Sequence, residues 1–144
     1  MLHGDISNKQ NMVMGFRVEG TLLHYREKGL KNKVLNSLLG KPQRAEIDKR
    51  VLSAIRYVFY KTDYTIALIV QESNYNRDLE YVLDKYNIPY TSVIKVVHNF
   101  SDVTDLIERG EISYYIDNRE ENRGLVNSMY AVDIDQFNTF LRRR

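Results

Sequence analysis

The sequence contains no cysteine and no long apolar run. Without cysteine the chain can form neither a disulfide nor a thiolate metal site, which fits a cytoplasmic protein. No apolar stretch approaches the roughly 18–20 residues that a membrane span needs. Residues 1–11 are polar and lack the apolar core of a signal peptide. The sequence therefore predicts neither export nor a membrane partner.

A strong net charge is also missing. The formal net charge of +2 is too small to indicate nucleic-acid binding by itself. The basic residues are nevertheless uneven, since they concentrate in residues 26–50 and in the terminal run Arg142–Arg144. Such runs are more often solvated helix faces than binding surfaces. Nucleic acid thus remains a weakly supported alternative partner.

Nothing in the sequence divides the chain. It has no internal repeat, no low-complexity segment and no linker rich in proline, glycine or serine. Its 144 residues suffice for one domain with a real core. We expect a disordered leader at residues 1–11 and a single domain over residues 12–144. The histidines show no ligand spacing, so a histidine metal site is not expected.

Apolar patterns of strands and helices alternate along the chain. The run Thr65–Val70 is short, continuous and rich in branched residues, which is typical of a fully buried parallel strand. Further strands are predicted near residues 13–18, 90–97, 112–116 and 129–134. Helices are predicted at residues 34–40, from Pro42 through Ile47 to Phe59, at residues 79–86, from a Ser101 cap to Gly110, and after an Asp135 cap.

This alternation predicts an α/β fold, a mainly parallel sheet flanked by helices. In such sheets ligands lie at the carboxyl ends of the strands. Polar side chains follow three predicted strands: Arg17 and Glu19, then Gln71 to Ser73, then Asp117 and Asn118.

The first strand carries a family resemblance. Residues 13–23 read Val-Met-Gly-Phe-Arg-Val-Glu-Gly-Thr-Leu-Leu, an apolar strand running into a Gly20-Thr21 turn. This stretch resembles the first motif of the haloacid dehalogenase-like (HAD) phosphohydrolases, an apolar strand followed by Asp-x-Asp-Gly-Thr. In that family the first Asp is the nucleophile and the second is the general acid/base. Here Arg17 and Glu19 stand in those places.

The other motifs of the family are matched in order. The resemblance places Gln71, with Ser73 nearby, where the family has a phosphate-binding Ser or Thr. Two residues compete for the family's lysine position, Lys95 and, more favoured, Asp102, which would mean that the lysine is lost. Tyr114 to Asn118 resembles the strand that ends in the magnesium-binding acidic pair, with an amide in the second place.

The resemblance covers about residues 12–141. It implies a Rossmann-like HAD core with a small helical insert, residues 26–61, between the first two motifs. It also implies a site at Arg17 and Glu19, with Gly20, Thr21, Gln71, Ser73 and Lys95 towards phosphate and Asp117, with Asn118, towards any metal.

The substitutions remove the family's chemistry. Arg17 has no lone pair and cannot attack phosphorus. Asp117 is the one obvious carboxylate left for a magnesium ion, which needs oxygen ligands. We therefore expect an Arg17–Asp117 ion pair in place of the metal, and no cofactor.

Three functions follow from these residues. The leading one is a catalytically impaired, phosphatase-like domain that binds a phosphate-bearing small molecule or a protein partner. The second is a divergent magnesium-dependent phosphatase or nucleotidase, with Glu19 or Asp117 as nucleophile. The third is a nucleic-acid-associated accessory protein that uses the basic helices and Arg142–Arg144.

Overall fold

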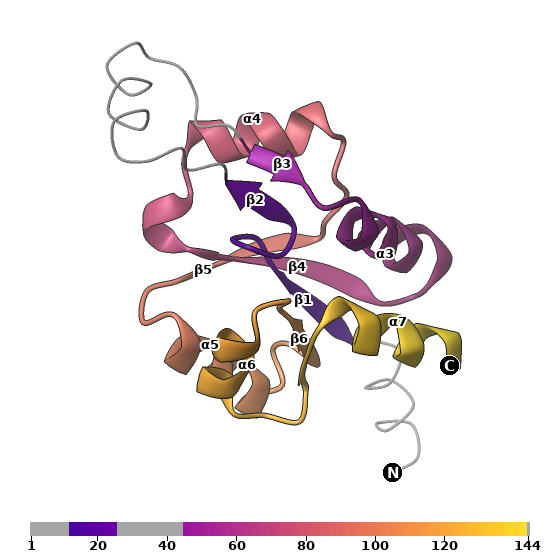
Figure 1. The fold of residues 1–144 in the computed structure, drawn as a ribbon, viewed down its shortest axis with the longest axis vertical. Helices are drawn as coiled ribbons and strands as arrows, with labels where there is room; N and C mark the ends of the chain where they lie inside the picture. Colours follow the sequence, from indigo (N-terminus) through magenta and orange to yellow (C-terminus); the bar gives the residue numbers. More distant parts are fainter. Residues whose placement is uncertain (1–11, 26–44, 144) are drawn as a thin grey trace.

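A five-stranded parallel sheet forms the centre of the molecule (Figure 1). The computed structural model describes residues 12–25 and 45–143. The strands are β1 (Val13–Arg17), β4 (Thr65–Gln71), β5 (Ser92–Val96), β6 (Tyr114–Ile116) and β7 (Ala131–Val132), in the order β5-β4-β1-β6-β7. Every neighbouring pair in this sheet is parallel. The predicted α/β class with a mainly parallel sheet is confirmed, and the fold is Rossmann-like.

Helices cover both faces of this sheet (Figure 1). On one face lie α3 (Lys49–Lys61), α4 (Arg77–Lys85) and α7 (Ile134–Arg143); on the other lie α5 (Phe100–Glu108) and α6 (Glu120–Val126). A short 3-10 helix, η1 (Glu72–Asn74), follows β4. Among the described helices none has the length and apolar character needed to cross a bilayer.

Strand β4 shows why helices must cover both faces of the sheet. Ile66, Leu68 and Val70 point to the core under α3, α4 and α7, whereas Ala67 and Ile69 point to the core under α5 and α6. Successive side chains of a strand alternate between the two faces of a sheet. Because all five are fully buried, the continuous apolar run is explained by burial on both sides.

A two-stranded antiparallel hairpin follows β1. It pairs β2 (Leu23–Tyr25) with β3 (Ala45–Ile47). The prediction of a helix from Pro42 through Ile47 is wrong over residues 45–48, because Ile47 pairs with Leu23 and Asp48 caps α3 by accepting hydrogen bonds from the backbone N–H groups of Arg50 and Val51. The predicted helix at residues 34–40 and the leader at residues 1–11 lie outside the described residues.

Three predicted element ends are also corrected. β7 is confined to Ala131–Val132 because Met129 and Tyr130 lie in a turn and Ile134 already belongs to α7. α7 is capped by Asp133 rather than Asp135: Asp133 Oδ1 accepts from Gln136 N–H at 2.8 Å, and Gln136 Oε1 accepts from Asp133 N–H at 2.9 Å. This reciprocal pair is a capping box.

The predicted Ser101 cap is the third. α5 begins at Phe100, so Ser101 lies inside its first turn, and the hydroxyl of Ser101 donates to His98 O. Asp102 instead holds the loop before the helix, since its Oδ2 accepts from the N–H groups of Val97 and His98.

The sheet order fixes where a site can form. β1 lies between β4 and β6, so the connection after β5 must cross to the other side of β1. Such a reversal of strand order is the place where open α/β sheets bind ligands, at the carboxyl ends of the strands. The residues that follow β1, β4 and β6 meet there.

Candidate functional site

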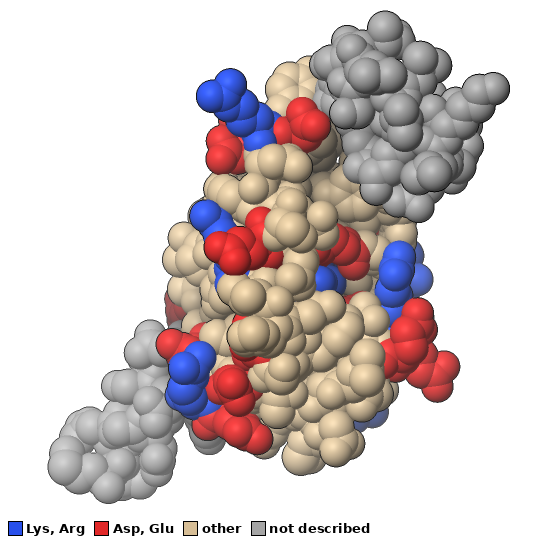
Figure 2. Space-filling model, turned by 90° about the vertical axis from the view of Figure 1, so that its left-hand side faces the viewer, with Lys and Arg blue, Asp and Glu red and all other residues tan. Residues whose placement is uncertain are grey.

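The chain leaves β1 through a tight turn that places Glu19, Gly20 and Thr21 at the sheet edge. Leu22 N–H donates to Arg17 O at 3.2 Å and Leu23 N–H donates to Val18 O at 2.9 Å. Gly20 has φ +78°, a left-handed conformation that favours glycine. Figure 2 looks onto this edge, and there acidic and basic side chains are intermixed.

Arg17, the last residue of β1, is the buried cation of the site. Its residue exposure is 4%. Nε lies 3.0 Å from Glu19 Oε1, and Nη1 donates to Asn99 Oδ1 at 2.8 Å. Nε and Oε1 form an ion pair without hydrogen-bond geometry, since neither atom completes a hydrogen bond. The guanidinium also lies over the Phe100 ring, with Cζ 5.4 Å from the centroid.

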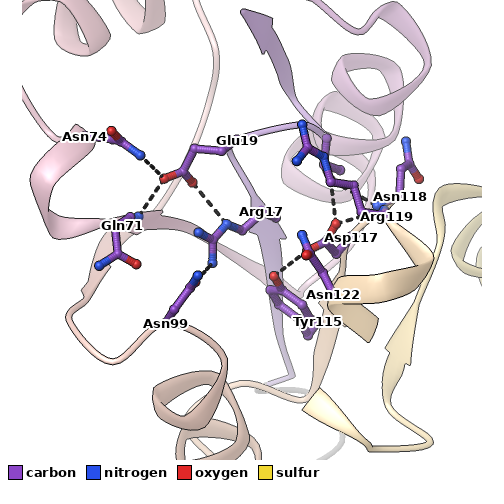
Figure 3. Close-up of polar contacts among 11 residues, drawn as sticks. Arg17, Glu19, Gln71, Asn74, Asn99, Tyr115, Asp117, Asn118, Arg119 and Asn122 are labelled. Atoms are coloured by element: carbon purple, nitrogen blue, oxygen red, sulfur yellow. Dashed lines mark hydrogen bonds and ion pairs between the residues drawn. The ribbon is translucent and has the colours of Figure 1, made fainter. Parts of the chain in front are cut away.

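Glu19 is fixed by two further donors (Figure 3). Its Oε2 accepts from Gln71 N–H at 2.9 Å and from Asn74 Nδ2 at 2.6 Å. With Oε1 facing Arg17, both carboxylate oxygens are occupied. Glu19 thus links the ends of β1 and β4, and a carboxylate held in this way is not free to accept a proton from a substrate.

Asp117, directly after β6, is fully buried and saturated with donors (Figure 3). Oδ1 accepts from the Thr21 hydroxyl at 3.3 Å and from Arg119 N–H at 3.0 Å. Oδ2 accepts from the Tyr115 hydroxyl at 2.6 Å and from Asn122 Nδ2 at 3.0 Å. Four donors to one carboxylate offset the cost of burying its charge.

The predicted Arg17–Asp117 ion pair is wrong. Arg17 pairs with Glu19, and neutral donors satisfy Asp117. The Tyr115 hydroxyl interacts with both charged groups: burial, then the charge of Asp117, raises the Tyr115 pKa, while Arg17 acts in the opposite direction. The neutral Tyr115 phenol therefore interacts with both Arg17 and Asp117, the two residues that we expected to form an ion pair.

Arg119 lies across the turn at Gly20. A Cβ placed on Gly20 would lie 2.4 Å from Arg119 Nε, so the guanidinium rests on the bare glycine backbone. Arg119 is exposed, and no ion pair joins its side chain to an acid within the described residues. A second arginine, Arg123, donates from Nη1 to Asp117 O at 2.9 Å. The mouth of the site, where the Gly20 turn meets the start of α6, therefore carries two arginines close to the Asp117 carboxylate.

The remaining predicted site residues take other places. Gln71 Nε2 donates to Val97 O at 3.0 Å, and its buried Oε1 has no hydrogen-bond partner in the described part of the chain. Ser73 is exposed in η1. Lys95 lies away from this network, with Nζ 4.3 Å from the centroid of the Tyr75 ring. Asn118 joins the site through its backbone, since its N–H donates to the Thr21 hydroxyl at 3.0 Å.

The residues present do not fit a magnesium ion. Both oxygens of Asp117 already accept hydrogen bonds, and a guanidinium stands at the end of β1 where a second carboxylate would be needed. Within residues 12–25 and 45–143, no group of three or more His, Cys, Asp or Glu side chains could hold a metal ion.

Sequence reasoning assigned no role in this site to six of its residues: Asn74, Asn99, Tyr115, Arg119, Asn122 and Arg123. Asn99 adopts φ 47°, a conformation uncommon for a residue with a side chain, and this brings its amide oxygen to Arg17. For Arg119, Asn122 and Arg123 the signal available in the sequence was the polar run that follows Asp117 and Asn118. Its hydrogen-bond partners depend on side-chain directions that spacing does not fix.

Comparisons of the chain with protein-family models, with curated proteins and with solved structures gave no match.

Proposed function

We propose that this chain is a HAD-like domain that binds a phosphate-bearing ligand without hydrolysing it. The observation that carries the proposal is the state of Arg17. At the end of the central strand, where the family has its nucleophilic carboxylate, the chain has a guanidinium held by Glu19 and Asn99. A guanidinium stays protonated and has no electron pair to give to phosphorus.

The sheet order supports the assignment of the motifs. β1 is the central strand, and it pairs in parallel with β4 and with β6. The carboxyl ends of these three strands therefore lie at one edge of the sheet, and this edge carries the three motif residues Arg17, Gln71 and Asp117. Arg17 and Gln71 are both linked to Glu19, and Asp117 is linked to the Gly20-Thr21 turn through Thr21. Three separate segments of sequence thus form one connected polar network.

The positive charges at the mouth support a phosphate-bearing ligand. Arg119 is exposed beside Gly20, and Arg123 lies in the first turns of α6 next to Asp117. Arginine side chains can hold two phosphate oxygens through paired N–H groups. In the proposed complex Arg119 contacts the phosphate directly, while the buried Arg17 contributes to the electrostatic potential.

The same network argues against a divergent phosphatase. For Asp117 to attack phosphorus, it would have to leave four donors in a place with no solvent exposure. Glu19 would have to separate from Arg17 and from two donors. Each such step costs several hydrogen bonds to a charged group.

Hydrolysis of an aryl phosphate and of a nucleotide panel, with magnesium and with chelator, tests the absence of catalysis. We expect no turnover from the wild type or from Asp117→Ala. Metal-dependent turnover that Asp117→Ala abolishes would identify an active enzyme and overturn the proposal.

Titration calorimetry with inorganic phosphate and nucleoside monophosphates, in chelator, tests binding. We expect Arg119→Ala to weaken binding about tenfold or more, the loss of one charge-assisted contact. Arg109→Ala is the matched control, because Arg109 is an exposed arginine at the end of α5 that pairs with Glu111. Absence of binding, or equal binding by both variants, would show that phosphate does not bind at this site.

A further inference from the structure

The fold brings two basic segments together that are far apart in sequence. α3 and α7 are in contact on one face of the sheet, at the right of Figure 1. α3 contains four basic residues and no acidic one, and α7 contains two arginines and one aspartate. Together the two helices carry a net charge of +5, whereas the whole chain carries +2. Within residues 12–25 and 45–143, positive charge is therefore concentrated on these two helices.

Exposed aromatic rings accompany these charges. Tyr57 is 43% exposed and Tyr60 is 67% exposed. Together with Arg50 and Ser53 they follow at intervals of three, four and three residues, so they form one stripe along α3. A solvated helix face needs charges but no exposed aromatic rings, so this stripe calls for a ligand that uses both.

A groove lies between the two helices beside this stripe. It has a volume of about 360 Å³ and is lined by residues of both helices: Arg50, Ser53, Ala54, Tyr57, Asn138, Leu141 and Arg142. The groove has apolar residues, hydroxyl and amide groups, one aromatic ring and an arginine from each helix. Arg50 also pairs with Asp135, but no acidic side chain of the described residues pairs with Arg142. We call this feature the α3–α7 groove.

We propose that the α3–α7 groove binds single-stranded nucleic acid. Its volume is at the lower end of small-molecule pockets, which suits one nucleobase rather than a protein helix. Tyr57 can stack on that base, and Arg142 with Arg50 can contact the flanking phosphates. Ser53 and Asn138 offer hydrogen bonds to base edges. An acidic peptide would use the arginines but would leave the tyrosine rings without a role.

This inference does not depend on the phosphate site at the sheet edge. The α3–α7 groove uses none of the residues that hold Arg17 or Asp117. Either proposal can therefore fail alone.

Fluorescence anisotropy of a labelled twelve-residue oligothymidine, measured with the full chain at several KCl concentrations, tests the proposal. We expect saturable binding at low salt, with a logarithmic salt slope of about −1.4 if two phosphates are contacted, one by each arginine. Tyr57→Leu should weaken binding about tenfold, whereas Tyr57→Phe should retain it because the ring remains. Arg142→Gln should weaken binding and reduce the slope by about 0.7.

Two controls match these variants. Tyr81→Leu changes a tyrosine that is 58% exposed on α4, and Arg109→Gln changes an exposed arginine on α5. Both should bind as the wild type does. Absence of binding at low salt, or equal losses in the control variants, would overturn the proposal. Displacement of the oligonucleotide by polyglutamate of matched charge, as effectively as by unlabelled oligothymidine, would show a general polyanion surface and overturn it as well.

Discussion

The Arg17–Glu19 ion pair is largely shielded from solvent, with side-chain exposures of 5% and 17%, so its two charges should be strongly coupled. Arg17→Met leaves the Glu19 carboxylate without its cation and removes the bond to Asn99. We expect the free energy of unfolding to fall by about 3 kcal/mol. Adding Glu19→Gln should recover part of this loss, giving a coupling energy of about 2 kcal/mol in a urea double-mutant cycle.

The chain offers an exposed pair as a control for this cycle. Arg109 Nη2 lies 2.9 Å from Glu111 Oε2, and both side chains are more than half exposed. Exposed pairs are worth at most about 1 kcal/mol, so this cycle should show a much smaller coupling. Equal couplings in the two cycles would mean that Arg17 and Glu19 are held by the fold and not by each other.

Replacing two glycines near the site by alanine should change the free energy of unfolding in opposite directions. Gly20 combines φ +78° with the guanidinium of Arg119 against its Cα, so Gly20→Ala adds backbone strain and displaces Arg119. We expect a loss of about 1–2 kcal/mol in unfolding free energy. Gly124 lies inside α6 with open space around it, so Gly124→Ala should stabilise the protein by up to about 1 kcal/mol. Thermal unfolding of both variants checks the opposite signs.

At the scale of elements, Asp102 joins β5 to α5 and makes this connection sensitive to acid. Hydrogen bonds from the N–H groups of His98 and Val97 lower the Asp102 pKa from its ordinary value of 3.8. A lowered pKa in the folded state means that the contribution to stability is present above pH 3.8 and is lost as the pH falls below it. We expect Asp102→Asn to lose less stability than the wild type between pH 5 and about pH 2.5.

Carboxyl chemical shifts measured by NMR across that range test the cause directly. A titration of Asp102 at or above 3.8 would contradict the lowered pKa. Equal acid sensitivity of the wild type and of Asp102→Asn would assign the loss of stability to other carboxylates.

The sequence predicted elements well where local pattern and burial agree. The branched run at Thr65 predicts β4 because burial on both faces requires an apolar side chain at every position. The helix prediction failed at residues 45–48. There Ile47 fits a helical stripe, but it pairs with Leu23, which is distant in sequence. Pairing with a distant strand leaves no local pattern, so tertiary context overrode the helical spacing.

For the candidate site, too, one part could be predicted from the sequence and another could not. Its position at the strand ends could be predicted, because the carboxyl ends of parallel strands meet at one edge. The partners could not: Asp117 accepts from Tyr115 and Asn122, and Arg17 turns to Glu19 and Asn99. These choices depend on rotamers and on the left-handed backbone of Asn99, which spacing does not encode.

At the scale of the whole molecule, the two faces of the sheet differ in how much they bury. The core under α3, α4 and α7 contains many more buried residues than the core under α5 and α6. α6 contributes a single buried side chain, Val126, while Leu125 is exposed. Elements with few buried apolar contacts open locally at a lower free energy than the global unfolding. We therefore expect the amides of α6 to exchange with solvent well before those of β1 and β4, as measured by native-state hydrogen exchange.

This local opening connects stability to the proposed function, because α6 also holds Asp117. Asn122 and Arg123 bind the side chain and the backbone of Asp117, so opening of α6 removes two of its partners. A ligand that binds only the closed form slows such opening by mass action. Saturating inorganic phosphate should therefore slow exchange in α6 and leave β5, at the far edge of the sheet, unchanged. Slowed exchange in wild type but not in Arg119→Ala would locate the phosphate at the mouth. Unchanged exchange in α6 would show that the anion binds elsewhere.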